Sequence, residues 1–380
     1  MVQGKPMNSS TIIYYGGFTL PDKSASANRV VSNAKLFAAL GYKTVLIGAA
    51  PHGECFDGVR KISGQEDMYE YSHPESTAQW LKHMLSVDHI AEAVGKYGNV
   101  SRIILYNVPM LTLVKAKKVF SKKNIEVCYD CTEWTRDTDG SLPKRVFKLL
   151  DEFFISNFAH KVADGMIAIS RMMARKYKSS KKLLILPPLV DINDNIWHQP
   201  TESNPDIFEF CFAGIPDGNK ESLDRIVEAF CNINKSNTRL RIIGVSQEDF
   251  RKNYPDCVIP QKTLGKIDFM GILPHKDTVR YILGCDCYIF IRRPDKRNNA
   301  GFPTKFAESY TCGVPVITTD VSDVGEYITN SGRGTLLKDM TVKSISAAML
   351  RQAENPIPEK SPDRTFHYES YIQPTVSWLK

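Results

Sequence analysis

The sequence predicts an α/β protein made of two doubly wound parallel-sheet domains in tandem. The chain has 380 residues, more than one hydrophobic core usually organises. Short apolar runs alternate with segments of helical periodicity, a pattern typical of parallel sheets with helices on both faces. The alternation lapses once, in the polar, proline-bearing stretch INDNIWHQPTESNPD, and then starts again. We therefore expect two α/β units joined by a linker.

The first unit opens with the β-rich run TIIYYGG at residues 11–17, which ends in glycines. Apolar residues at helical spacing follow from Ala27 to a glycine stop at Gly41 and predict the first helix. Further buried strands are predicted at residues 42–50, 101–108, 125–130, 165–170 and 181–191. This pattern gives an N-terminal domain at 1–191 and a linker at 192–206.

The second unit repeats the pattern with the strand FEFCFAG at 208–214 and the helix ESLDRIVEAFCNI at 221–233. Strands are then predicted at 238–244 and 285–291, so the C-terminal domain spans 207–358. Aromatic residues recur in the tail at 359–380. We expect a final helix there that packs back on the N-terminal domain, anchored by Tyr371 and Trp378.

The charge of the chain is positive and uneven. The formal net charge is +7. Residues 1–190 hold 26 Lys and Arg against 17 Asp and Glu, a balance of +9, and the remainder holds 23 against 25, a balance of −2. Part of the excess lies in the run KAKKVFSKK, from Lys115 to Lys123. This run is either a solvated helix face or a surface for an anionic partner, such as phospholipid headgroups or a pyrophosphate-linked acceptor. No nucleic-acid-binding motif accompanies it.

The cysteines and the apolar runs indicate the cellular compartment of the protein. Nine dispersed cysteines favour reduced cytosolic thiols over a disulfide framework, and the lone pair Cys128 and Cys131 lacks the later partners of a zinc site. No apolar run is long enough to span a bilayer, and the first residues do not read as a secretory signal. We expect a cytoplasmic protein, peripheral at the inner face of a membrane, with no metal and no cofactor.

The segment most suggestive of chemistry is AGFPTKFAESYTCGVPVITTD, residues 300–320. Pro303 suits the first turn of a helix from Thr304 to Cys312, which Gly313 ends before a buried strand. Lys305 and Glu308 then share one face near the start of this helix. The preceding strand delivers Arg292 and Arg293 to the same sheet edge, where open α/β sheets bind ligands.

Two interpretations of this segment remain open. Lys305 and Glu308 form either a surface ion pair or part of an anion site, in which an arginine, Lys305 and helix N–H groups converge on a diphosphate. In the second case Glu308 accepts hydrogen bonds from sugar hydroxyls beside that diphosphate.

The same segment resembles the donor site of the retaining glycosyltransferases of the GT-B fold, the family 4 or group 1 type that includes bacterial polysaccharide enzymes. A glycine-proline loop, a helix with a glutamate and CG-x-PV recur together there. The segments TIIYYGGFTLPDKSASANRVVSNAKLFAALG, ADGMIAISRMMARKYKSSKKLLILPPLVD, FCFAGIPDGNKESLDRIVEAF and IDFMGILPHKDTVRYILGCDCYIFI are similar to other parts of the family, so about four-fifths of the chain is covered. The resemblance implies two Rossmann-like domains facing a central cleft.

The resemblance also assigns roles to residues. Glu308 matches the glutamate that holds the nucleotide ribose, and Lys220 the lysine that binds the donor diphosphate; these two are the catalytic candidates. Further donor-binding candidates come from matching loops or from the geometry above: Gly16, Gly17, Gly214, Ile272, Leu273, Arg292, Arg293, Pro303, Thr304 and Lys305. The loop Gly271–His275 matches the one beside the base, and His275 is otherwise expected to be a turn residue.

The sequence departs from the family pattern at three positions. Ala300 stands where the first glutamate of a pair is usual, with Asn298 and Asn299 beside it. Ile215 and Pro216 stand near the place of a usual arginine, and Asn107 near that of a usual histidine.

The acceptor candidates lie in the first domain. The loop YDCTEWTRD follows a predicted strand, and its polar residues are candidates to receive an acceptor hydroxyl. The acceptor-side candidates are Asn107, Asp130, Glu133 and Trp134.

These inferences converge on a glycosyltransferase of the hexosyltransferase type. It would move a sugar from a nucleotide-diphosphate sugar to a glycan or lipid-linked acceptor in cell-surface polysaccharide synthesis, with no nucleic-acid partner. Two alternatives remain: a catalytically silent partner subunit that binds nucleotide sugars, and a sugar-nucleotide epimerase of the same fold.

Overall fold

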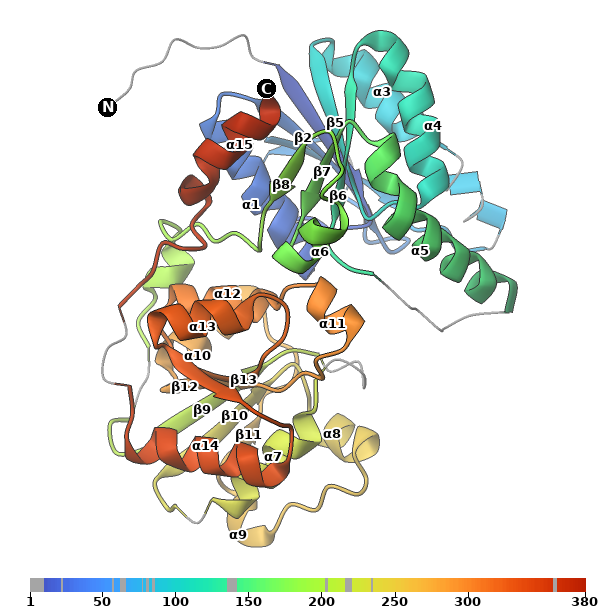
Figure 1. The fold of residues 1–380 in the computed structure, drawn as a ribbon. Helices are drawn as coiled ribbons and strands as arrows, with labels where there is room; N and C mark the ends of the chain where they lie inside the picture. Colours follow the sequence, from blue (N-terminus) through green and yellow to red (C-terminus); the bar gives the residue numbers. More distant parts are fainter. Residues whose placement is uncertain are drawn as a thin grey trace. The chain divides into compact units, whose positions relative to one another are not determined.

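A computed structural model gives the fold of the chain (Figure 1). The structure describes residues 10–21, 23–56, 58–61, 66–76, 78–79, 82–83, 86–134, 142–201, 204–215, 221–233, 235–357 and 361–380. The chain divides into two compact units, Met1–Leu189 with Tyr368–Lys380 (unit 1) and Val190–His367 (unit 2). The stretch predicted as a linker is counted within unit 2, where it contains the short helix η2 (Asn195–His198).

Unit 1 is built on an eight-stranded sheet. Its strands, in spatial order, are β3 (Arg60–Lys61), β4 (Glu66–Ser72), β2 (Lys43–Ala50), β1 (Thr11–Gly16), β5 (Val100–Tyr106), β6 (Glu126–Cys131), β7 (Gly165–Ala168) and β8 (Leu183–Ile185). All neighbours are parallel except β3, which runs antiparallel to β4. The chain moves outward from β1 to β2 and β4 and then returns to β5 on the other side of β1. The order of connections therefore reverses between β1 and β5.

Helices cover both faces of this sheet. In Figure 1, α1 (Ala25–Ala39) and α15 (Ile372–Leu379) lie on one face, and α4 (Met110–Phe120) and α5 (Leu142–Val162) on the other. Unit 1 also contains α3 (Asp88–Tyr97), η1 (Ser121–Lys123), α6 (Arg171–Lys176) and η3 (Tyr368–Tyr371).

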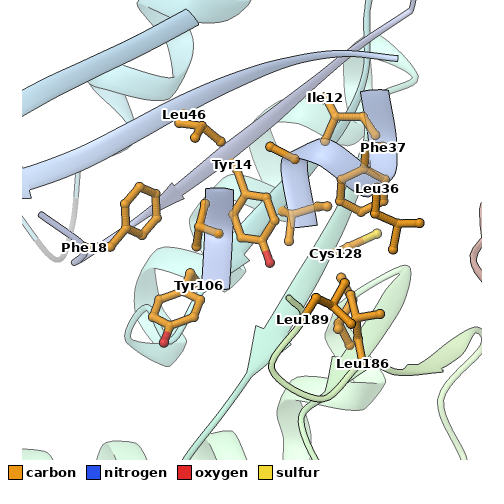
Figure 2. Close-up of a cluster of buried hydrophobic side chains, with 14 of the residues drawn as sticks. Ile12, Tyr14, Phe18, Leu36, Phe37, Leu46, Tyr106, Cys128, Leu186 and Leu189 are labelled. Atoms are coloured by element: carbon orange, nitrogen blue, oxygen red, sulfur yellow. The ribbon is translucent and has the colours of Figure 1, made fainter. Parts of the chain in front are cut away.

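The core of unit 1 lies between β1, α1 and their neighbours. Figure 2 shows Ile12 and Tyr14 of β1, Phe37 of α1 and Leu46 of β2 in one buried cluster. Burying each such side chain contributes about 1.5–3 kcal/mol. Trp378 of α15 belongs to the same cluster, and its ring packs closely on Gly165, where a Cβ would lie 3.1 Å from the ring. This contact explains why the tail of the chain belongs to unit 1.

Unit 2 is built on a six-stranded, all-parallel sheet. Its strands, in spatial order, are β11 (Ile267–Phe269), β10 (Thr238–Ile243), β9 (Phe208–Ala213), β12 (Cys287–Phe290), β13 (Val316–Thr319) and β14 (Gly334–Leu337). The order of connections reverses between β9 and β12. Both units are thus doubly wound, as the sequence predicts, because buried parallel strands appear in it as continuous apolar runs.

The helices of unit 2 also lie on two faces. Figure 1 shows α7 (Leu223–Asn232) and α14 (Val342–Glu354) side by side on one face, and α10 (His275–Gly284), α12 (Thr304–Thr311) and α13 (Val324–Ser331) on the other. Unit 2 also contains the shorter helices α8 (Gln247–Asn253), α9 (Gln261–Leu264) and α11 (Lys296–Ala300). In the part of the chain that the structure describes, no helix has both the length and the apolar character needed to cross a membrane.

Candidate functional site

The reversal between β9 and β12 defines the first candidate site. In open α/β sheets, ligands bind outside the carboxyl ends of the strands where the order of connections reverses. In unit 2, β9 ends at Ala213 and β12 at Phe290, so Gly214 begins one loop at this place and Arg292 lies two residues after the end of β12. The Tyr288 hydroxyl donates to the Ala213 carbonyl at 3.0 Å and ties the two strand ends together.

Helix α12 begins at the same edge. Pro303 precedes its first residue, and Gly313, at φ +73°, lies just beyond its end, in a backbone conformation that favours glycine. The first N–H groups of a helix have no intrahelical partners, so the start of α12 offers donors to an anion. The helix agrees with the sequence prediction to within one residue.

Glu308 lies one turn into α12, and two basic side chains contact its carboxylate. Its side chain is buried, with 3% of the residue exposed. Lys305 Nζ lies 2.7 Å from one carboxylate oxygen, and His275 Nε2 lies 3.2 Å from the other. Burial acts to raise the pKa of Glu308, but the Lys305 charge and the His275 contact outweigh it and lower that pKa to about 2. A buried carboxylate is thus kept ionised beside a helix N-terminus.

This shift predicts a specific acid sensitivity. The pKa of Glu308 is depressed from its ordinary 4.5 to about 2, so its ion pairs stabilise the fold fully above about pH 5 and lose that contribution as the pH falls toward 2. Between about pH 5 and pH 2, the free energy of unfolding of Glu308→Gln should therefore fall less than that of the wild type. The difference between the two losses should be up to about 3 kcal/mol. Urea unfolding at a series of pH values measures this. Glu354→Gln, at an exposed position at the end of α14, is the control and should follow the wild type. Parallel acid curves for wild type and Glu308→Gln would contradict the assignment.

The two arginines behave differently from each other. The Arg292 guanidinium pairs with Glu221: Nε donates to Oε1 at 2.9 Å, and Nη2 donates to the same oxygen. This pair links the end of β12 to the loop before α7. Arg293 is exposed and, among the residues that the structure describes, has no carboxylate partner. That Arg292 and Arg293 contact a diphosphate remains a prediction.

The loop after β9 is described only in part. Lys220 and Pro216 lie outside the described residues. The Gly214 carbonyl approaches Gly244, which has φ +102° and whose absent Cβ would lie 2.2 Å from that oxygen. Only glycine at position 244 allows the ends of β9 and β10 to come this close.

The loop before α10 leads to His275, a residue that contacts Glu308. Gly271, at φ +63°, accepts a hydrogen bond from the Gly244 N–H at 2.7 Å, so the loop abuts the end of β10. Ile272 is 77% exposed and Leu273 is half-buried. The expectation that His275 is only a turn residue is wrong, because it is the first residue of α10 and its ring reaches Glu308. Only its place in the loop that resembles a base-binding loop could have indicated this.

A second reversal, between β1 and β5, lies in unit 1. A Cβ on Gly16 would lie 2.6 Å from the Tyr106 carbonyl oxygen, so glycine is needed for the two strands to pack. Gly17 is exposed, and a Cβ there would meet no atom within 4 Å, so its backbone is open to a ligand. At the end of β5, Asn107 (φ +47°) accepts from the Thr132 N–H at 3.0 Å and donates to its hydroxyl at 2.6 Å.

Asp130, an acceptor-side candidate, is fully buried at 0% exposure. Arg29 donates to both of its oxygens, at 2.9 Å and 3.1 Å, and the Tyr14 hydroxyl donates to the second. Burial and the neighbouring Asp130 charge raise the pKa of Tyr14 well above its ordinary value. These contacts give Asp130 a structural role and do not support one toward an acceptor, since its oxygens are already occupied.

The other two candidates follow β6. Trp134 is buried and donates from Nε1 to the Tyr177 hydroxyl at 3.1 Å, while Glu133 is half-buried. Within the described residues, no group of three or more His, Cys, Asp or Glu side chains is arranged to hold a metal ion.

Comparison with protein families decides the class of the site. Residues 195–366, which contain Glu308, Lys305, His275 and Arg292, match the family described as glycosyl transferases group 1. The chain carries a group 1 glycosyltransferase domain. The prediction of a glycosyltransferase is thereby confirmed, although no curated protein matches the chain by sequence.

Solved structures place this glycosyltransferase on a known fold. It is similar to sucrose-phosphate synthase from Thermosynechococcus elongatus (TM-score 0.72, 15% identity, 97% of this chain and 98% of that chain). It is also similar to HepE from Anabaena in complex with UDP and glucose (TM-score 0.65, 12% identity, 97% of this chain and 99% of that chain). A third similar structure is that of the UDP-forming α,α-trehalose-phosphate synthase from Burkholderia vietnamiensis (TM-score 0.62, 9% identity, 98% of this chain and 96% of that chain). At these identities the likeness shows the fold, and it confirms the GT-B prediction.

Proposed function

We propose that this glycosyltransferase moves a sugar from a nucleotide-diphosphate sugar to a glycan or lipid-linked acceptor, with its donor bound at the carboxyl edge of the unit 2 sheet. The observation that carries the proposal is Glu308, a buried carboxylate held ionised one turn into a helix at the reversal of a group 1 domain. An ionised carboxylate accepts hydrogen bonds only, so it suits the ribose hydroxyls of a nucleotide.

The cations and helix N–H groups of this edge suit the diphosphate. The side chain of Lys305 is partly exposed, so it can turn from Glu308 toward a bound anion. Lys220, in the loop after β9, would bind the same diphosphate, and the start of α12 would add N–H donors. Arg292 holds Glu221, the residue next to Lys220 in the sequence.

The reaction would be a displacement at the anomeric carbon. The bond from that carbon to the diphosphate oxygen breaks, a bond to the acceptor oxygen forms, and the acceptor proton passes to the departing diphosphate. The main contribution of the protein would be to stabilise the charge that develops on this leaving group. We propose a retaining reaction that needs no metal, since these cations can neutralise that charge and the family it resembles is retaining.

A uridine donor is the best first candidate. The similar HepE structure holds UDP and glucose, and the similar trehalose-phosphate synthase is UDP-forming. Exposed Ile272, in the loop that resembles a base-binding loop, offers an apolar contact for the base.

The acceptor would meet unit 1, which carries the basic excess of the chain. Within the run Lys115–Lys123, Lys117 pairs with Asp164, whereas Lys118, Lys122 and Lys123 are exposed. These lysines suit an anionic membrane surface or a pyrophosphate-linked acceptor. We therefore propose a cytoplasmic enzyme, peripheral at the inner face of a membrane, that acts in cell-surface polysaccharide synthesis.

Release of nucleotide diphosphate tests the proposal. The protein is incubated with UDP- and GDP-sugars, with and without lipid-linked acceptors, and Lys220→Ala should lower the rate of release at least about tenfold. Lys262→Ala, at an exposed lysine of α9, is the control and should leave the rate unchanged. Binding without release under every acceptor would instead favour a silent partner, and conversion of the donor into an isomeric sugar nucleotide would favour an epimerase.

A further inference from the structure

Helix α5 carries an apolar stripe on its exposed side. Six large apolar side chains of this helix are 37% to 55% exposed: Val146, Leu149, Leu150, Phe153, Phe154 and Phe158. They recur at intervals of three and four residues and therefore share one side of the helix. The three phenylalanine rings contact one another, with centroids 5.6, 5.9 and 6.2 Å apart, so the stripe ends in an aromatic cluster.

Other side chains of α5 pack against unit 1. Ala159 and His160 are buried, and Asp151 accepts a hydrogen bond from the Met110 N–H at the start of α4 at 2.8 Å. The helix is therefore docked on unit 1, with α4 alongside it (Figure 1). In α4, the apolar side chains of Leu111 and Val114 are exposed as well.

Basic side chains lie near both ends of the stripe. Lys161 Nζ lies 5.3 Å from the centre of the Phe158 ring, and Lys176 Nζ donates to Asn157 of α5 at 3.0 Å. Arg145 is exposed near the start of the helix, and the exposed lysines of the Lys115–Lys123 run belong to α4 and η1. The only carboxylates among the described side chains of α5, Asp151 and Glu152, are both half-buried.

We propose that α5 inserts its apolar stripe into the interface of an anionic bilayer, while the basic side chains around it contact the headgroups. A phenylalanine- and leucine-rich helix face bordered by lysines has the character of helices that lie in a membrane interface. A symmetric contact with a second copy of the chain fits less well, because it would bring two basic rims together. The inference deepens the proposed membrane association, since it names the inserting element, and it is independent of the sugar chemistry.

Vesicle binding by the full chain tests the proposal. Phe153→Ser/Phe154→Ser should weaken partitioning onto phosphatidylglycerol-containing vesicles on the order of tenfold or more, with little binding of either protein to pure phosphatidylcholine. Val146→Ser and Val258→Ser form a matched pair, because both remove an exposed valine and only the first lies on the stripe. The first should weaken binding and the second should not.

Insertion itself is measured with Phe154→Trp. Its fluorescence should shift to the blue when anionic vesicles are added and should be quenched by brominated acyl chains. Binding without quenching would overturn the proposal in favour of adsorption by the lysines alone. A dimer in vesicle-free solution that Phe153→Ser/Phe154→Ser dissociates would overturn it in favour of a second copy.

Release of nucleotide diphosphate in vesicle-free solution separates the two proposals. Phe153→Ser/Phe154→Ser should keep this activity, because no residue of the stripe is among the donor-binding candidates. If the wild type inserts into vesicles yet releases no nucleotide diphosphate from any donor, the sugar-transfer proposal fails and the membrane inference stands.

Discussion

Glu308→Gln should lower kcat/KM for the nucleotide sugar at least about tenfold, which corresponds to ~1.4 kcal/mol of transition-state stabilisation. The substitution keeps the size of the side chain but removes the charge that His275 and Lys305 now hold. A neutral amide is a weaker acceptor for ribose hydroxyls than a carboxylate. Steady-state kinetics with the donor at saturating acceptor measure the effect, and Glu308→Ala should lose at least as much.

Two control variants make this result specific. His275→Ala removes one of the two contacts of Glu308 and should cost less than Glu308→Gln, because Lys305 still holds the carboxylate. Glu354→Gln should leave the kinetics unchanged. If Glu308→Gln and Glu308→Ala both turn over at the wild-type rate while remaining folded, the donor site lies elsewhere.

Asp130→Ala should destabilise unit 1 by about 3–5 kcal/mol. Asp130 is fully buried, and its partner Arg29 is 4% exposed, so the substitution would leave a guanidinium in the core without its counter-charge. The Arg29 donors to the Leu186 and Pro187 carbonyls, at 2.8 Å and 3.2 Å, cannot replace that charge. Thermal and urea unfolding followed by circular dichroism measure the loss.

The exposed ion pair between Lys23 and Glu54, at 3.9 Å, provides the comparison. Glu54→Gln should change stability by at most about 0.5 kcal/mol, because exposed pairs are screened by water. Wild-type stability of Asp130→Ala with lost transfer activity would contradict the structural role and restore Asp130 as a residue that receives the acceptor.

The fold could be predicted from the sequence because buried parallel strands produce continuous apolar runs. Strand β4, Glu66–Ser72, was not predicted, since EDMYEYS mixes charged and aromatic residues and its outer neighbour is only the short β3. Helix α12 was predicted nearly to the residue, because the proline before it and the glycine after it are local signals.

The partners of the site residues could not be predicted in the same way. Glu308 lies 33 positions from His275, Arg292 lies 71 from Glu221, and Asp130 lies 101 from Arg29. These contacts form only when the sheets bring distant strand ends together, and no local pattern encodes them. For this reason Asp130 looked like a polar loop residue, whereas it is an ion-pair partner inside the core.

A crystal structure with bound UDP tests the donor site most directly. We predict that the nucleotide lies at the carboxyl edge of the unit 2 sheet, with a ribose hydroxyl within hydrogen-bond distance of Glu308 and the diphosphate against the start of α12. UDP bound away from this edge, with Glu308 still held only by Lys305 and His275, would contradict the account.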